Sequence, residues 1–143
     1  MFAIKHQLSI KATADKVFKM LATAEGLDLW WTLSASGKFA LNEIITLNFG
    51  PDYIWKAKIE KFEMNKYIHY KMLDAMDDWK DTVIKIEVKA SGSNSTLIFH
   101  HTMWKEENDH FQGSSYCWAV YLRLIKKYLE NGKTVIYDKR LDV

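Results

Sequence analysis

Hydrophobic and polar residues alternate from the beginning of the chain. Phe2, Ile4, Leu8 and Ile10 fall in one row, with lysine, glutamine and serine residues in the other. A period of two is typical of a β-strand that has one buried and one solvated face. His6 belongs to the inward row. The pattern therefore predicts an opening strand over residues 2–10 that carries a histidine toward the interior.

Two short helical segments are expected after this strand. Thr13 is a suitable N-cap, and the apolar residues that follow it, including Phe18, recur at helical spacing. The sequence Glu-Gly-Leu at residues 25–27 interrupts this helix. A second helical turn is then predicted to carry Trp30 and Trp31.

The alternation returns in pieces between residues 37 and 103. Turn-forming sequences separate the pieces at residues 51–52, 65–66 and 91–95. Connections this short join antiparallel neighbours. The last strand of the series places His101 and Met103 in its inward row. The segment is therefore predicted to form an antiparallel meander with one dry face.

The last long element is predicted to be a helix from about Asp109 to Asn131. Apolar residues recur every three or four positions along it, and Gly132 stands where glycine commonly ends a helix. Such a helix is about 30 Å long, and its apolar stripe needs a sheet to cover. Residues 134–143 are expected to form a C-terminal tail that is loose or lies across a partner.

Composition and charge exclude several classes of protein. A chain of 143 residues that is 48% hydrophobic, with six glycines and one proline, is typical of one globular domain. The net charge is only +2 and there are two arginines, which argues against nucleic-acid binding. No apolar run approaches the roughly 20 residues of a membrane span. The single cysteine, Cys117, fits a cytoplasmic location.

No motif indicates a metal, a cofactor or a catalytic nucleophile. His100 and His101 are adjacent in a strand, so they face opposite sides and cannot chelate one ion. Neither a nucleophile elbow nor a glycine-rich phosphate-binding motif occurs. Ser114, Ser115 and Cys117 are read as small residues that let the long helix approach the sheet. We therefore assign no catalytic residue, no metal and no cofactor, and the sequence favours a protein that is not an enzyme.

A cavity is expected between the long helix and the sheet. A helix is only about 10–12 Å across, whereas six or seven strands spaced at about 4.8 Å span a much wider surface. The remaining concave space is either filled by side chains or left as a pocket. Tryptophan and tyrosine at inward positions favour a pocket, because each supplies a large apolar wall and one polar atom.

Short sequence motifs in a fixed order point to a known family. They are Ala-Asp-Lys-Val-Phe at 14–18, Trp-Trp-Thr at 30–32, Trp79 with Thr82, residues 96–104, Trp118 with Tyr121-Leu122, and residues 128–133. With them, the chain resembles the family of the activator of Hsp90 ATPase (AHSA1-type), within the SRPBCC, START and Bet v 1-like superfamily. The similarity covers nearly all of residues 1–133. It implies a helix-grip fold, an internal ligand cavity and a connection with the stress response.

Two departures from the family bear on function. The family often has glycine before the tryptophan that follows its histidine-containing strand, but Met103 stands here, which predicts a narrower pocket mouth. Hsp90 activators also use a separate N-terminal domain for much of their chaperone contact. The sequence is expected to lack that domain, which weakens the co-chaperone hypothesis.

Ten residues are candidates for a ligand site. Aromatic walls are expected from six inward residues, with Trp79 at a hairpin rim where it would control access. His6 and His101 lie on strands that are neighbours in this fold, so we expect them near one another. With Tyr121 they would orient the polar end of a ligand, and Leu122 would add apolar area. The six aromatic candidates are Trp30, Trp31, Trp55, Tyr70, Trp79 and Trp118.

Each candidate also has a structural interpretation. Aromatic residues at core spacing commonly serve only as core, and a buried histidine commonly satisfies its hydrogen bonds inside the protein. The sequence alone leaves both interpretations open.

The predicted protein is an α+β helix-grip domain over residues 1–133. A curved antiparallel sheet of six to seven strands is expected to wrap around a long C-terminal helix, with two short helices after the first strand. The main functional hypothesis is binding of a small apolar or amphipathic molecule between that helix and the sheet. The alternatives are a partner of a chaperone ATPase and an enzyme of the cyclase or dehydratase type. A homodimer through an exposed strand edge or the tail is compatible with the sequence.

Overall fold

The computed structural model describes all residues 1–143. Seven strands form one antiparallel sheet in the order β1-β7-β6-β5-β4-β3-β2. This arrangement confirms the predicted meander, with the first and last strands as neighbours. The strands are β1 (Phe2–Ile10), β2 (Ser34–Ser36), β3 (Ile44–Asn48), β4 (Ile54–Glu63), β5 (Tyr67–Asp74), β6 (Val83–Ser91) and β7 (Asn94–Trp104).

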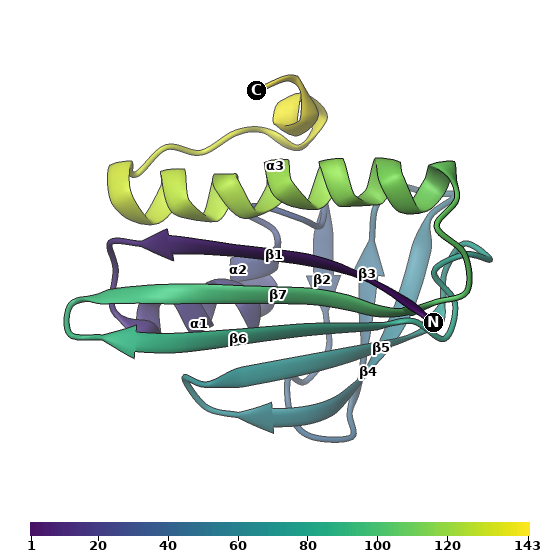
Figure 1. Cartoon of the computed structure of the whole chain (residues 1–143), viewed down its shortest axis with the longest axis horizontal. Helices are drawn as coiled ribbons and strands as arrows, with labels where there is room; N and C mark the ends of the chain where they lie inside the picture. The colour runs from purple at the N-terminus through teal and green to yellow at the C-terminus, as the bar shows by residue number, and fades with distance from the viewer.

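Three α-helices accompany the sheet. The long helix α3 (Asp109–Asn131) runs along β1, while the short helices α1 (Ala14–Leu21) and α2 (Ala24–Leu27) follow β1 in the chain. In Figure 1 strands β2 and β3 run across the direction of β1, which shows how strongly the sheet curves. The helix-grip α+β fold predicted from the sequence is confirmed.

The two ends of α3 are fixed by the signals that the sequence carries. The Asn108 side chain accepts a hydrogen bond from the backbone N–H of Phe111 at 2.9 Å, which caps the first turn. At the other end Gly132 has φ +68°, the left-handed conformation that glycine adopts without a steric penalty. The helix therefore occupies the predicted range.

Helix α2 is shorter than the sequence suggests, because Trp30 and Trp31 lie in turns after it. A close approach of the two short helices holds this region in place. A Cβ atom on Gly26 would lie 2.2 Å from the carbonyl oxygen of Lys19, so only glycine fits. The indole N–H of Trp30 also donates to the carbonyl oxygen of Met20 at 2.8 Å. These contacts determine where the tryptophan pair enters the core.

One cluster of 29 buried hydrophobic residues forms the core, and Phe2 and Met103, which were expected to face inward, lie outside it. They are 42% and 45% exposed. Met103 has φ +69°, so its backbone adopts a left-handed conformation that disfavours any side chain with a Cβ atom. This is a backbone conformation that glycine adopts without a steric penalty.

The C-terminal segment differs from the expectation of a loose tail. Residues Tyr137–Asp142 form a 3-10 helix, η1, which packs beside α3 at the top of Figure 1. Arg140 is buried and donates hydrogen bonds to the carbonyl oxygens of Thr32, at 3.1 Å, and Asp28. The Tyr137 hydroxyl donates to the carbonyl oxygen of Phe49 at 3.2 Å. The segment therefore folds back on its own domain.

Candidate ligand-binding groove

A groove of about 410 Å³ opens between the first half of α3, strand β4 and the connections that follow α2, β3 and β5. Its volume falls within the range of roughly 300–1,000 Å³ typical of small-molecule sites. Seven of its eleven lining residues are hydrophobic, and we call it the aromatic groove. It is lined by Trp31, Phe49, Trp55, Trp79, Asp109, His110, Gly113, Ser114, Cys117, Trp118 and Tyr121.

Five aromatic side chains of the groove form a closed cycle of contacts. Adjacent ring centroids are 5.5 Å apart for Trp31 and Phe49, 5.0 Å for Phe49 and Trp55, and 5.2 Å for Trp55 and Trp79. Trp118 closes the cycle, at 5.6 Å from Trp79 and 5.1 Å from Trp31. Trp79 and Trp118 are stacked at 23°, whereas the other four pairs are tilted by 48° to 60°. The five rings therefore contact one another in turn, four times in a tilted and once in a stacked arrangement.

Trp79 lies in the connection between β5 and β6 and is folded inward rather than left at the rim. It is 7% exposed, and its indole N–H donates to the hydroxyl of Ser114 on α3 at 3.2 Å. The Thr82 hydroxyl donates to the carbonyl oxygen of Trp79 at 2.5 Å. Trp79 is therefore attached to both the sheet and the helix, and its side chain forms one wall of the groove.

His101 lies beneath this wall, and its two hydrogen bonds define its tautomer. The indole N–H of Trp118 can only donate, so His101 Nδ1, 3.1 Å away, accepts. His101 Nε2 therefore carries the proton and donates to the Thr82 hydroxyl at 2.8 Å. Burial lowers the pKa of His101 from its ordinary 6.5 to about 3, which keeps the imidazole neutral. Both nitrogens are occupied within the protein.

Two of the ten candidate residues are sealed in the core and do not line the aromatic groove. Trp30 and Tyr70 are completely buried. The Tyr70 hydroxyl donates to the carbonyl oxygen of Leu21 at 2.5 Å, and burial raises its pKa. Since the polar atoms of both side chains are satisfied by the α1 backbone, both residues serve as part of the core.

His6 and Leu122 line a different surface groove of about 560 Å³, between β1 and α3. His6 Nε2 lies 3.1 Å from the carbonyl oxygen of Ser115 and donates to it, which ties β1 to the helix. His6 pairs with Phe99 across the strands, while Ile4 is the residue opposite His101. The two histidines thus bond to different partners and do not converge on one point. Five of the ten candidates line the aromatic groove: Trp31, Trp55, Trp79, Trp118 and Tyr121.

Six lining residues are absent from the sequence-based candidates: Phe49, Asp109, His110, Gly113, Ser114 and Cys117. Five of them belong to the first turns of α3 and share a face with Trp118 and Tyr121. The signal in the sequence is Gly113, because glycine inside a long helix costs about 1 kcal/mol relative to alanine. A Cβ atom there would meet nothing within 4 Å, so the missing side chain leaves open space beside the groove.

The polar groups of the groove are few. His110 Nδ1 lies 3.0 Å from a carboxylate oxygen of Asp78, and these side chains connect the start of α3 to the β5–β6 connection. Burial raises the pKa of the Cys117 thiol, and it raises the pKa of Tyr121 to about 12. Both groups are therefore protonated and uncharged at neutral pH. The charged groups lie at the rim.

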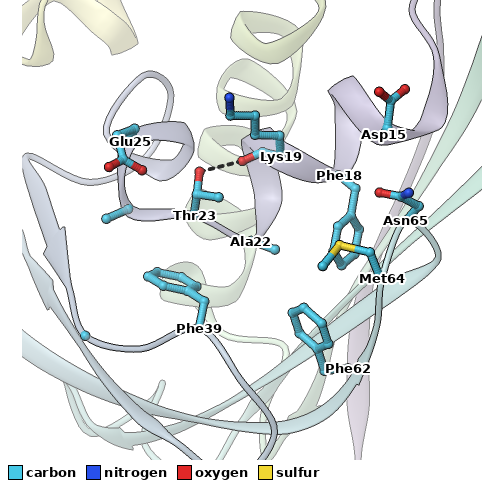
Figure 2. A pocket seen from close by; sticks show the side chains of 12 residues that line it. Asp15, Phe18, Lys19, Ala22, Thr23, Glu25, Phe39, Phe62, Met64 and Asn65 are labelled. Atoms are coloured by element: carbon cyan, nitrogen blue, oxygen red, sulfur yellow. Dashed lines mark hydrogen bonds between the residues drawn. The ribbon is translucent and has the colours of Figure 1, made fainter.

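A second hollow, of about 680 Å³, lies at the short helices, and we call it the α1–α2 hollow. Figure 2 shows that Phe18, Phe39, Phe62 and Met64 face one another inside it. Phe18 and Phe62 are in edge contact, with centroids 5.6 Å apart. Its lining is more polar than that of the aromatic groove, with only six hydrophobic residues among twelve. None of the predicted site residues lies there.

No group of three or more histidine, cysteine, aspartate or glutamate side chains is arranged to hold a metal ion. None of the helices combines the length and the hydropathy needed to cross a lipid bilayer.

Comparison with known proteins identifies relatives of this chain. The sequence profile of the family described as Activator of Hsp90 ATPase homolog 1-like protein matches residues 11–130. None of the curated proteins compared with the chain matches it significantly.

Solved structures of the same fold come from several bacteria. The solution structure of the Aha1 dimer from Colwellia psychrerythraea is 30% identical with a TM-score of 0.84, over 93% of this chain and 99% of that one. The protein SSP2350 from Staphylococcus saprophyticus is 21% identical with a TM-score of 0.79, over 94% and 96% of the two chains. The second likeness shows the shared fold only.

Proposed function

The chain belongs to the Activator of Hsp90 ATPase homolog 1-like family, and we propose that it binds a small apolar or amphipathic molecule in the aromatic groove. The observation that carries the proposal is the cycle of five contacting aromatic rings around a groove of about 410 Å³. Large apolar walls with a few polar groups at one end are typical of small-molecule sites.

The groove offers a ligand two distinct environments. Trp31, Trp79 and Trp118 are nearly completely buried and form the apolar inner part of the groove. Asp109 and His110 lie at the start of α3, where the side chains reach solvent. An amphipathic molecule would therefore contact aromatic rings in the inner part of the groove and polar side chains near the helix start.

Gly113→Leu provides a test that does not depend on damaging the fold. A leucine side chain here would project into open space beside the groove, while removal of a helical glycine favours folding by up to about 1 kcal/mol. We expect the variant to lose binding of the neutral fluorescent probe N-phenyl-1-naphthylamine, measured by titration, and to unfold at an equal or higher urea concentration.

Gln112→Leu is the matched control, because residue 112 is exposed on the same helix and does not line the groove. It should bind the probe as the parent protein does. Equal probe binding by Gly113→Leu and the parent protein would contradict the assignment of the groove.

A second candidate function is contact with an ATPase chaperone of the Hsp90 type, which family membership favours.

The cyclase or dehydratase hypothesis would require a catalytic base in the groove, and His110 paired with Asp78 is the group placed to supply one. A homodimer, as in the Colwellia psychrerythraea relative, and a cytoplasmic location belong to the same set of proposals. Affinity capture from cell extract that recovers no chaperone ATPase would remove the second candidate.

A further inference from the structure

The charges around the aromatic groove have one predominant sign. The β5–β6 connection and the segment before α3 supply six carboxylates and two lysines between residues 77–81 and 105–109. The two segments are held together at Asp78, which lies 3.0 Å from His110 and 3.4 Å from the Asn108 side chain. On a chain with a net charge of +2, the groove therefore opens beside a locally acidic surface.

Neither lysine nor arginine lines the aromatic groove. This distinguishes it from the other two hollows described above. Lys19 lines the α1–α2 hollow, and Arg123 and Lys126 line the groove between β1 and α3. The one carboxylate among the lining residues of the aromatic groove is that of Asp109.

The start of α3 does not make the groove attractive to anions either. The first turn of a helix attracts anions because its backbone N–H groups lack partners. Here the Asn108 side chain accepts from the N–H of Phe111, and Asp109 places a negative charge in the same turn. An anionic ligand would meet a capped helix end and a carboxylate.

In addition to the acidic surface, the aromatic cycle offers rings that can attract a cation. The faces of aromatic rings carry negative electrostatic potential and attract ammonium groups within about 6 Å of the ring centroid. For a regular five-membered cycle with sides near those observed, the centre lies no more than about 4.5 Å from each centroid, inside that range. Tryptophan gives the strongest such interaction, and four of the five rings are tryptophans.

We propose that the ligand of the aromatic groove is an amphipathic organic cation, with an alkylammonium or quaternary ammonium group held by the aromatic cycle and the carboxylate of Asp109. This inference rests on the proposed function and specifies the ligand class of the same site. A quaternary ammonium group is especially suited. It has no N–H groups that need hydrogen-bond acceptors, and the rings of the cycle offer aromatic surface rather than free acceptors. The hydrocarbon part of the ligand would lie along Tyr121 and Cys117.

The test compares three probes that share one hydrocarbon chain. Hexyltrimethylammonium, hexanesulfonamide and hexanesulfonate are cationic, neutral and anionic, and each is titrated into the intact protein by calorimetry. We expect the cation to bind with a dissociation constant about tenfold lower than that of the neutral probe, the magnitude of a partly desolvated cation–π contact. The anion should bind more weakly than either, and added salt should weaken only the cation.

Two variants assign the preference to this site. Trp55→Leu removes one aromatic face of a half-buried side chain, and Asp109→Asn removes the exposed carboxylate while keeping its shape. Each should reduce the advantage of the cation over the neutral probe by several-fold. The matched controls Tyr53→Leu and Asp142→Asn change exposed residues outside the groove and should leave that advantage intact.

The outcomes separate this inference from the proposed function. If the neutral or anionic probe binds as tightly as the cation and Gly113→Leu removes that binding, the groove is a ligand site but the cation assignment is wrong. If none of the three probes binds, the cation assignment is wrong, whereas the proposed function is overturned only if N-phenyl-1-naphthylamine also fails to bind or binds Gly113→Leu as it binds the parent protein. A cation preference that persists in both Trp55→Leu and Asp109→Asn would also contradict the cation assignment.

Discussion

The two halves of α3 meet the rest of the protein in different ways. Beyond Tyr121 the helix buries branched aliphatic side chains, and Leu124 and Ile125 are at most 3% exposed. Before Tyr121 it faces flat aromatic rings that touch one another yet leave about 410 Å³ open. Branched aliphatic side chains interdigitate to crystal-like density, so the interior is filled around Leu124 and Ile125, which we call the closed half. The flat aromatic rings contact one another and still border the aromatic groove, which we call the open half. The groove of about 560 Å³ at Leu122 lies at the surface beside β1.

The largest effect is expected in the closed half. Ile125→Ala should lower the free energy of unfolding by about 3 kcal/mol, because it leaves a cavity in packed surroundings. Trp55→Leu in the open half should cost about 1.5 kcal/mol or less, because Trp55 is half-buried and already borders open space. Urea denaturation of both variants measures the two values. Equal losses would contradict the distinction between the halves.

His101, which lies beneath Trp79, allows the stability of the open half to be tested by its dependence on pH. Its folded-state pKa of about 3 lies below the unfolded value of 6.5, so between these limits the unfolded chain binds a proton that the folded protein does not. Stability should therefore fall as the pH drops below 6.5, by about 1.4 kcal/mol per pH unit from this residue. His101→Gln, whose amide can replace both hydrogen bonds, should remove that contribution.

The measurement is the difference in unfolding free energy between parent and variant from pH 6 to pH 4. Burial also lowers the pKa of His69, to about 4, but this residue and the carboxylates are common to both proteins. Their effects therefore cancel in the difference. Parallel pH profiles would show that His101 is not held neutral.

Arg140 tests whether the C-terminal segment holds the groove-lining residues Trp31 and Phe49 in place. Arg140→Ala leaves the carbonyl oxygens of Thr32 and Asp28 without their donors and should cost about 1–2 kcal/mol. Exchange of the backbone N–H groups should become faster at residues 28–32. It should also become faster around Phe49, whose carbonyl oxygen accepts a hydrogen bond from Tyr137. Lys139→Ala, at an exposed neighbour, is the control and should change neither. Unchanged exchange in Arg140→Ala would mean that the wall is rigid without this support.

The smallest effect is expected at Met103, which precedes Trp104 at the end of β7. Because its φ is +69°, Met103→Gly should be more stable than Met103→Ala by about 1 kcal/mol. Thermal unfolding of the two variants gives the comparison, and it avoids the contacts that the methionine side chain itself makes. A more stable alanine variant would argue against the strained backbone.

Periodicity predicted the elements well because it reports which face of an element is buried. Strand β1 and helix α3 occupy the predicted ranges, and Gly132 ends α3 as expected. Periodicity does not report whether an inward side chain lies in a sealed or an open region. Trp30 and Trp31 are adjacent in the sequence, yet only Trp31 lines the groove.

The position of an aromatic residue depends on contacts between distant parts of the chain. Trp30 is sealed because its N–H reaches the carbonyl oxygen of Met20, whereas Trp79 forms a wall because it reaches Ser114, 35 residues away. The fold-back of Arg140 onto Thr32, separated by 108 residues, could not be read from local pattern either. The candidate site was therefore only half predictable from the sequence.

The fastening of the groove wall by Tyr137 and Arg140 has a consequence for the order of assembly. These contacts join residues that are 88 to 112 positions apart in the sequence. Each therefore closes a long loop, and the entropy lost in closing it is offset by only a few hydrogen bonds. A nascent polypeptide of 136 residues would already contain every strand and α3, but its binding surface would still lack this fastening. The groove would then gain this support only after residues 137–140 have been synthesised.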